Sequence, residues 1–412
     1  MKRRTFLGMT SIGMVSVGRP RARKMASVEQ PADSADEPLM RTPLCDLLEI
    51  RHPIVQSGMG RVAGPELAAE VSRAGGLGVL AGLGLSGDEL RAQIRKLREL
   101  TDRPFGVNLW LHEELVTPVD SRQIPEETIQ QIQTELNRFR QGLGLPAKFD
   151  RPPSFPDVVD SAFEAILEER APVFSIGLGD PGRERVLRCR ERGVKVMAMV
   201  ATVEDARQVA ASGADVIVAQ GGEAGGHRST WKRPPSREHA NIGLMALVPQ
   251  IVEAVDVPVV AAGGIADGRG LVAALALGAA GVLVGTRFVA TRESTAPDFW
   301  KNALLGASSD STTVTEALTG LPARALRNTF TEEYAASNAP VLPSLLQAQA
   351  AGDIYAAAAA RGDAAHFPLM AGQGVGLLRD LPGAGDVVRH IVHEARAVMA
   401  SLAERSSAPG PR

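Results

Sequence analysis

One histidine in this chain stands at the end of a glycine-rich stretch. Residues 219–230 read AQGGEAGGHRST, with four glycines around Glu223 and with His227 directly after the last of them. Histidine is the usual general acid or base near neutral pH, and glycines let a backbone pass close to a flat ligand and adopt positive φ. The stretch is therefore typical of a loop that brings an imidazole over the ring of a ligand. An ordinary turn with a capping histidine is the alternative that these residues alone leave open.

Two later segments place small residues at the ends of apolar runs. In VVAAGGIADGRG these residues are Gly263 and Gly264, and Asp267 opens the helix that follows. In GVLVGTRFVAT they are Gly285 and Thr286. Backbone N–H groups at such turns, together with a helix N-terminus, bind phosphate groups well. The two segments therefore predict a phosphate cradle, and two tight turns are the alternative.

The elements that would position these groups alternate along the chain from residue 53. Short apolar runs, most of which end in glycine, alternate with helical stretches, and eight such runs occur: PIVQSG, LGVLAG, FGVNLWL, VFSIGLG, KVMAMVA, DVIVAQG, VPVVAAGG and GVLVGT. Runs that are apolar on both faces are typical of a parallel sheet covered by helices, and eight units close a (β/α)8 TIM barrel. We predict this α/β fold, with its site at the carboxyl ends of the strands. A doubly wound open sheet is the alternative, but it would concentrate its glycine signals at one switch point.

Segments outside the repeat divide the chain further. We predict a barrel over residues 41–292 with a helical insertion over about 112–156, after the third strand, and a mainly helical extension over 293–412. The insertion is expected to cover the site. The loop RSTWKRPPSREH after His227 is expected to be a mobile lid, and the alanine run at 356–360 a packing or oligomer surface. Trp110, His112 and Trp231 are either pocket lining or plain surface.

The first 40 residues form a separate leader. Arg3 and Arg4, followed by Phe6 and Leu7, resemble a twin-arginine export signal, but the stretch continues into RPRARK and lacks an A-x-A cleavage pattern. A disordered leader, or sequence ahead of a true start at Met25 or Met40, is the alternative. We therefore expect a cytoplasmic protein and keep export as the alternative.

Composition narrows the class of partner. The 412 residues carry 45 Lys+Arg and 47 Asp+Glu, a net charge of -2, and they offer no basic face for nucleic acid and no apolar run that is long enough to span a bilayer. A small-molecule substrate is favoured, and a homodimer is the expected assembly. Cys45 and Cys189 lie far apart without metal-ligand spacing, so we assign neither a disulfide nor a metal.

Several motifs together resemble one known family. The motifs PIVQSGMG, PFGVNLWL, AQGGEAGGHR, VVAAGGIADGRG, GVLVGTRFVATRES and AGQGVGL occur here in the order typical of the nitronate monooxygenases, formerly called 2-nitropropane dioxygenases, which are related to the FMN-dependent enoyl-ACP reductases. The resemblance runs from about residue 42 to residue 380. It implies a TIM barrel that binds FMN without covalent attachment and oxidises alkyl nitronates with molecular oxygen to a carbonyl compound and nitrite.

The resemblance also implies roles for single residues. The flavin ring or its ribityl chain would contact Ser57, Gly58, Met59, Asn108 and Gly225, and the phosphate would contact Gly263, Gly264, Gly285 and Thr286. His227 matches the family's catalytic histidine, and we expect Glu223 to shape the loop. Met59 as a core residue and Asn108 as a partner of backbone groups are alternatives. Some relatives carry a flavin-contacting lysine where this chain has Met199, and we do not expect Lys195 to substitute for it.

Two other activities remain open. If NAD(P)H reduces the flavin and the flavin then reduces an enoyl thioester or a quinone, His227 would be a proton donor or would stabilise an enolate. A flavin-binding module without turnover is the alternative from another class, and the presence of His227 beside the complete phosphate cradle weighs against it.

Overall fold

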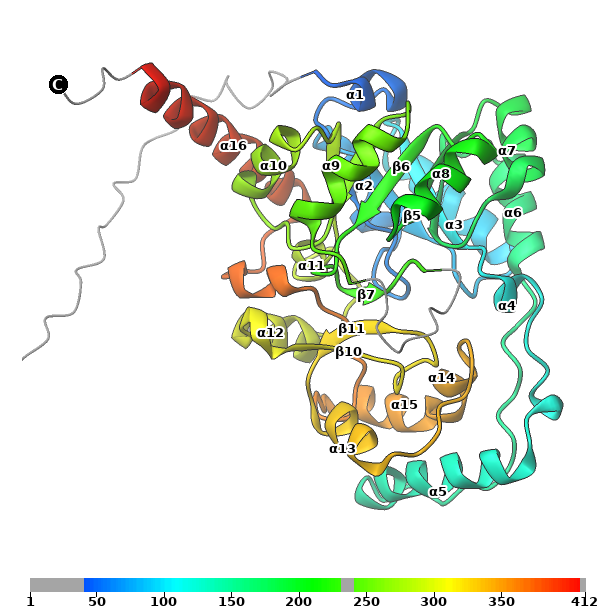
Figure 1. Ribbon diagram of the computed structural model, residues 1–412. Coiled ribbons are helices and arrows are strands. Elements are labelled where there is room, and N and C mark those ends of the chain that lie inside the picture. Colours follow the sequence, from blue (N-terminus) through cyan, green and yellow to red (C-terminus); the bar gives the residue numbers. More distant parts are fainter. Residues whose placement is uncertain (1–40, 231–240, 408–412) are drawn as a thin grey trace, which may run out of the picture. The chain divides into compact units, whose positions relative to one another are not determined.

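Eight parallel strands form the sheet that the sequence predicts, and helices lie around it (Figure 1). The strand order is β1-β9-β8-β6-β5-β4-β3-β2. Their bounds are β1 Ile54–Gln56, β2 Gly78–Ala81, β3 Phe105–Trp110, β4 Val173–Leu178, β5 Lys195–Val200, β6 Val216–Gln220, β8 Val259–Ala262 and β9 Gly281–Val284. The two ends of this order meet at a parallel bridge between Val55 and Leu77, where Leu77 N donates to Ile54 O and Gln56 N to Leu77 O, both at 2.9 Å. The sheet thus closes on itself. The predicted TIM barrel is confirmed, and the open sheet is excluded.

This computed structural model describes residues 41–230 and 241–407. All described residues belong to one compact unit, Pro38–Arg412. The predicted leader, residues 231–240, which hold Trp231 and most of the predicted lid RSTWKRPPSREH, and residues 408–412 lie outside the described residues. The first residues of that predicted lid, Arg228 and Ser229, are buried, so no mobile segment begins directly after His227.

Side chains of each strand alternate between two cores, as strand geometry requires. In β6, Val216 and Val218 belong to the cluster inside the barrel, together with Val260 from β8. Ile217 and Ala219 belong to the cluster between the sheet and the helices. Because both faces are buried, the strands read as continuous apolar runs in the sequence.

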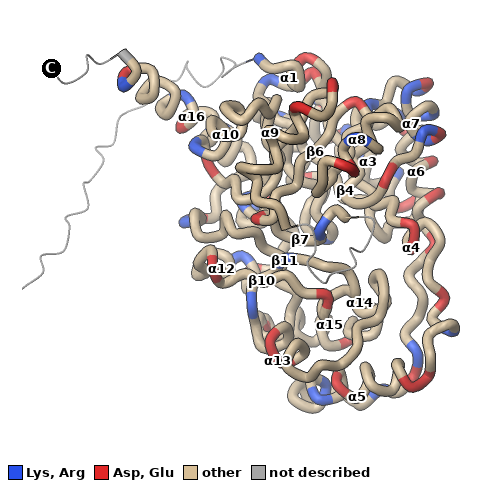
Figure 2. Tube along the Cα trace, viewed as in Figure 1, with Lys and Arg blue, Asp and Glu red and all other residues tan. Residues whose placement is uncertain are grey.

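Helices cover the outside of the barrel. They are α2 Pro65–Arg73, α3 Gly87–Leu100, α6 Val159–Glu168, α7 Gly182–Glu191, α8 Val203–Ser212, α9 Leu244–Ala254, α10 Gly268–Ala276 and α11 Thr286–Val289. Helix α1, Pro43–Leu48, instead covers the amino ends of the strands, where Leu44 and Cys45 join the inner cluster. Side chains cap several of the outer helices: Ser86 and Glu89 form a capping box on α3, and Asp267 accepts from Arg269 N and Gly270 N at the start of α10, as predicted. Figure 2 shows both signs of charge along the outer helices.

The long helix α16, Ala384–Ser407, returns to the barrel and packs on α2 and α10. Its residues Val388 and Ile391 are part of the core between sheet and helices. Gly268 is needed at this contact, because a Cβ there would lie 2.2 Å from Ala395 N. None of the described helices is long and apolar enough to cross a membrane.

The insertion after β3 packs on the C-terminal extension. It contains α4 Glu113–Val116, η1 Ser121–Gln123 and α5 Glu126–Gly142. Ile132 and Leu136 of α5 share a core with Phe330 of the extension. The fully buried Arg140 fixes this contact, since it donates to Asp353 at 3.0 Å and to the Ala350 carbonyl at 2.7 Å.

The extension is mainly helical, as predicted, but it also holds a small sheet that the sequence did not indicate. Its elements are α12 Asp298–Gly306, η2 Ser309–Ser311, β10 Thr312–Thr315, β11 Ala323–Leu326, α13 Thr329–Ser337, α14 Leu346–Ala350, α15 Gly352–Arg361 and η3 Gln373–Leu377. Strands β10 and β11 are antiparallel, and β11 pairs with β7, Gly226–His227, which comes from the barrel. His227 therefore lies in a short strand and not in the free loop that the glycines suggested.

Candidate active site

The carboxyl ends of the barrel strands open into a cavity of about 1140 Å³, as expected for this fold. Residues of the loops that follow β1, β6, β8 and β9 line this cavity, together with residues of the extension. All ten residues predicted for the site line this cavity: Ser57, Gly58, Met59, Asn108, Gly225, His227, Gly263, Gly264, Gly285 and Thr286. The fold thus brings together side chains and turns that are spread over 230 positions of the sequence.

Contacts on both its backbone and its ring hold His227. Gln220 Nε2 donates to the His227 carbonyl at 2.8 Å, and the backbone of His227 pairs with Ala323 of β11. The Trp110 ring meets the imidazole edge-on, with the ring centroids 4.5 Å apart. On the far side, His227 Nε2 lies 2.8 Å from Thr319 Oγ1. Trp110, which the sequence left as pocket or surface, therefore belongs to the site.

Burial lowers the pKa of His227 from 6.5 to about 3, and the positive charge of Arg228 contributes to the same shift. The imidazole is consequently neutral across the physiological range. A neutral imidazole has one nitrogen with a lone pair, which is what a general base needs.

Two buried arginines hold the glycine-rich loop before His227. Arg228 donates to the Gly221 carbonyl at 2.8 Å, and Arg324 of β11 donates to the Gly222 carbonyl at 2.9 Å. Glu223 accepts from Leu244 N at 3.0 Å and so caps α9. This contact confirms the expectation that Glu223 shapes the loop. Charge-assisted bonds of this kind are stronger than neutral ones, so the loop is firmly fixed.

The turns after β8 and β9 carry the donors expected of a phosphate cradle. Gly263 and Gly264 have φ of 123° and 69°, which favour glycine. The N–H groups of Gly264 and Ile265 donate no hydrogen bond within residues 41–230 and 241–407. Thr286 Oγ1 accepts from Gly372 N at 2.9 Å, so its hydroxyl proton is left to donate elsewhere. An anion would satisfy these groups.

The turn after β1 fits closely against β3. A Cβ at Gly58 would lie 2.3 Å from Asn108 Cβ, so glycine is required there. Asn108 is buried and donates to Ser175 Oγ at 3.1 Å, which leaves its amide oxygen for another partner. Met59 is half-buried at the edge of the cavity beside Gly285. These residues form a surface on which a flat ring could lie.

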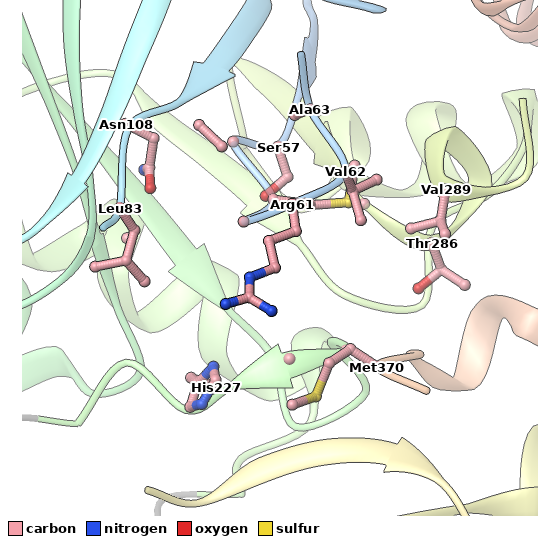
Figure 3. Close-up of a pocket in the computed structure, with 18 of the residues that line it drawn as sticks. Ser57, Arg61, Val62, Ala63, Leu83, Asn108, His227, Thr286, Val289 and Met370 are labelled. Carbon is pink, nitrogen blue, oxygen red and sulfur yellow. The ribbon is translucent and has the colours of Figure 1, made fainter. Parts of the chain in front are cut away.

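Arg61 is a cavity residue that the sequence reasoning missed. Its side chain points into the cavity from the wall that faces His227 (Figure 3). Its backbone has a φ of 57°, which is uncommon for a residue with a side chain, and Thr295 Oγ1 holds the turn by donating to its carbonyl at 3.0 Å. The guanidinium makes no ion pair or hydrogen bond within the described part of the chain. The sequence indicated this residue only as the single charged position within the segment GMGRVAG.

Met199 lies at the cavity end of β5, whereas Lys195 begins that strand at the opposite end of the barrel. The expectation that Lys195 does not substitute for a flavin-contacting lysine is confirmed, because the length of the strand separates it from the cavity.

The expectation that the insertion covers the cavity was wrong. The expectation that the alanine run is a packing surface holds in part, since Ala358 is buried while its neighbours line the cavity. Of the insertion over 112–156, Phe155 alone lines the cavity, because α5 is buried against the extension. The cover comes from the extension itself, where Ala356 and Ala359 of α15 line the cavity. The alanine run is thus part of the site wall, where its small side chains leave room for a ligand.

Comparisons with known proteins agree over most of the chain. The sequence profile of a family described as "Nitronate monooxygenase" matches residues 41–394. A nitronate monooxygenase from Pseudomonas aeruginosa is 38% identical over 357 residues, which cover 85% of this chain and 98% of that protein. A probable nitronate monooxygenase from Staphylococcus saprophyticus is 34% identical over 363 residues, with 87% and 99% covered.

Solved structures show the same similarity. A nitroalkane oxidase from Streptomyces ansochromogenes has a TM-score of 0.77 and 37% identity, and the match covers 87% of this chain and 99% of that one. FabK from Thermotoga maritima has a TM-score of 0.68 and 33% identity, with 89% and 99% covered.

Proposed function

Because the chain belongs to the nitronate monooxygenase family, a family of flavin-dependent oxidoreductases, we propose that it uses FMN and molecular oxygen to oxidise alkyl nitronates to a carbonyl compound and nitrite. The observation that carries the proposal is the neutral imidazole of His227 in the wall of a cavity whose turns after β8 and β9 offer N–H groups that have no partner among the described residues. The small-molecule substrate is then a nitronate, or the neutral nitroalkane from which it forms.

The residues of the cavity fit FMN. The phosphate would accept hydrogen bonds from the N–H groups after β8 that are free among the described residues, and from the Thr286 hydroxyl. Gly285, which has no side chain, would leave room for it. The ring and ribityl chain would lie against Ser57, Gly58, Met59, Asn108 and Gly225. When bound, the flavin supplies the redox chemistry, since it accepts electrons from the nitronate and passes them to oxygen.

His227 would act on the neutral nitroalkane. Its imidazole removes the proton from the carbon that bears the nitro group, which yields the anionic nitronate. A positioned base of this kind typically contributes about 10²- to 10⁴-fold to the rate. Arg61, which points into the same cavity without a counter-ion among the described residues, would attract the negative charge.

Anaerobic stopped-flow measurement of flavin reduction tests this function. Purified protein loaded with FMN is mixed with ethylnitronate, and in parallel with NADH or NADPH. Rapid bleaching by the nitronate and not by the nicotinamides is expected. Bleaching by the nicotinamides alone would replace the proposal with the enoyl-thioester or quinone reductase, and a protein that binds no flavin would remove the basis of both.

For assembly and location, the expectations from the sequence remain our proposals. We propose a homodimer, and light scattering by the purified protein tests this assembly. We also propose a cytoplasmic location. Export through the twin-arginine-like start is the alternative, and cell fractionation of the full chain distinguishes the two.

A further inference from the structure

The imidazole of His227 has a buried partner from outside the barrel. Thr319, in the turn between β10 and β11, places its Oγ1 2.8 Å from His227 Nε2 across 92 positions of sequence. Thr319 is 8% exposed, so water does not compete freely for this bond. The proposed function assigns no role to Thr319.

The surroundings of the Thr319 hydroxyl favour one position for the proton in this bond. A hydroxyl has one proton to donate and two lone pairs that accept. Thr319 Oγ1 lies 3.3 Å from the Leu321 carbonyl, which can only accept, and 3.4 Å from Leu321 N, which can only donate. If the hydroxyl proton points to the carbonyl, the lone pair that faces the ring must receive a proton from Nε2. The opposite orientation would take the hydroxyl proton away from a buried carbonyl, which costs free energy.

The other ring nitrogen then carries the lone pair. His227 Nδ1 forms no hydrogen bond with any described residue, and the ring lines the cavity (Figure 3). A neutral imidazole with its proton on Nε2 has its basic lone pair on Nδ1. The basic nitrogen is therefore the one without a partner in the protein.

The turn that carries Thr319 is held rigidly. The Thr319 carbonyl accepts from Leu345 N at 2.7 Å, and Tyr355 Oη donates to the Leu318 carbonyl at 3.0 Å. Gly320 has a φ of 87°, and a Cβ there would lie 2.1 Å from the Leu342 carbonyl. A hydroxyl fixed in this way can hold the ring in one orientation.

We propose that Thr319 is a positioning residue that keeps the Nε2 proton of His227 in a hydrogen bond, so that Nδ1 is the base that faces the substrate. The proposal rests on the proposed function for the reaction that Nδ1 serves, but the position of the proton is independent of it. It also assigns the extension a role in the chemistry, because the barrel alone would lack the group that selects the nitrogen.

Kinetics of two variants test the role in turnover. Thr319→Val keeps the shape and removes the hydroxyl, whereas Thr319→Ser keeps the hydroxyl. With FMN-loaded protein, we expect Thr319→Val to lower kcat/KM for neutral nitroethane at least about 10-fold, within the share that a general base contributes. Thr319→Ser should stay near the wild-type value, and ethylnitronate, which needs no deprotonation, should be oxidised at a similar rate by all three proteins. Equal loss with both substrates, or no loss with nitroethane, would overturn the proposal.

The tautomer itself is read by ¹⁵N NMR of histidine-labelled, FMN-loaded protein, with the His227 signal assigned by comparison with His227→Asn. We expect a protonated Nε2 and an unprotonated Nδ1 in the wild type and in Thr319→Ser, and mixed tautomers in Thr319→Val. A wild-type proton on Nδ1, or an unchanged pattern in Thr319→Val, contradicts the proposal. If neither substrate is turned over, the proposed function fails, and this spectrum still decides the role of Thr319.

Discussion

The indole of Trp110, at the end of β3, meets the imidazole of His227 edge-on, with the ring centroids 4.5 Å apart and the planes at 68°. Aromatic pairs of this geometry contribute about 0.5 to 1.5 kcal/mol beyond the burial of their surface. Because the contact limits rotation of the imidazole, we expect Trp110→Ala to lower kcat/KM for nitroethane by about 2- to 12-fold, which is that free energy expressed as a rate ratio. Trp110→Phe is the control, since it keeps an aromatic edge; an equal loss in both variants would argue against the ring contact.

Removal of the imidazole should affect kcat/KM for two substrates differently. We expect His227→Asn to lower kcat/KM for neutral nitroethane by about 10²- to 10⁴-fold, because the base is lost, and to change that for ethylnitronate far less. Steady-state oxygen consumption with both substrates measures the ratio.

In the wild type, kcat/KM for nitroethane should not decline as the pH falls from roughly 7 to 5, because the pKa of His227 is lowered to about 3. A decline centred near the ordinary histidine value would show that the ring is not buried as described.

The same lowered pKa predicts an acid sensitivity of folding. In the unfolded chain His227 has its ordinary pKa of 6.5, and in the folded chain about 3, so between these values the unfolded state binds a proton that the folded state does not. Stability therefore falls as the pH drops below 6.5. Since the ring borders an open cavity, we expect this residue to contribute a loss of about 1 to 2 kcal/mol between roughly pH 7.5 and pH 5. Urea unfolding of the wild type and of His227→Gln at both pH values measures it, and an equal loss in the two proteins would refute it.

The phosphate cradle predicts a difference between two flavins. Thr286→Val removes the hydroxyl proton that would reach the phosphate, and hydrogen bonds to charged groups contribute about 1.5 to 3 kcal/mol. We expect the Kd for FMN to rise about 10- to 150-fold, which is that free energy expressed as a binding ratio, while the Kd for riboflavin, which lacks the phosphate, stays unchanged. Quenching of flavin fluorescence measures both, and Thr286→Ser is the control. Equal weakening for the two flavins would place the phosphate elsewhere.

Arg61 predicts a dependence on substrate charge. We expect Arg61→Gln to raise KM for ethylnitronate about 10-fold, because a charge-assisted contact is lost, and to affect neutral nitroethane less. Lys96→Gln offers a matched control, since Lys96 also lines the cavity but is ion-paired with Glu66. A similar effect of both variants would indicate a general electrostatic influence. A loss of FMN binding in Arg61→Gln would assign the guanidinium to the cofactor.

The sequence by itself determined the alternation of strands and helices and the turns at which this fold could bind a ligand. Strands that are apolar on both faces and end in glycine are local patterns, and the fold brings their carboxyl ends to one side by necessity, so the turns at Gly58, Gly263 and Gly285 could be assigned to one cavity in advance. His227 could be found because a histidine directly after four closely spaced glycines is typical of a loop that brings an imidazole to a ligand.

Only the tertiary structure decided what surrounds that histidine. Thr319 is 92 positions away and lies in the turn between strands β10 and β11. The third strand of that small sheet, β7, is two residues long, too short for any periodicity to reveal. The apolar face of α5 in the insertion could pack on several elements. It packs on the extension, where the ring centroids of Phe139 and Phe330 lie 4.7 Å apart. Arg61 points into the cavity through a turn with positive φ that residue type does not predict. These features depend on contacts between distant segments, and such contacts are set by the packing of the whole barrel and extension and not by the local sequence.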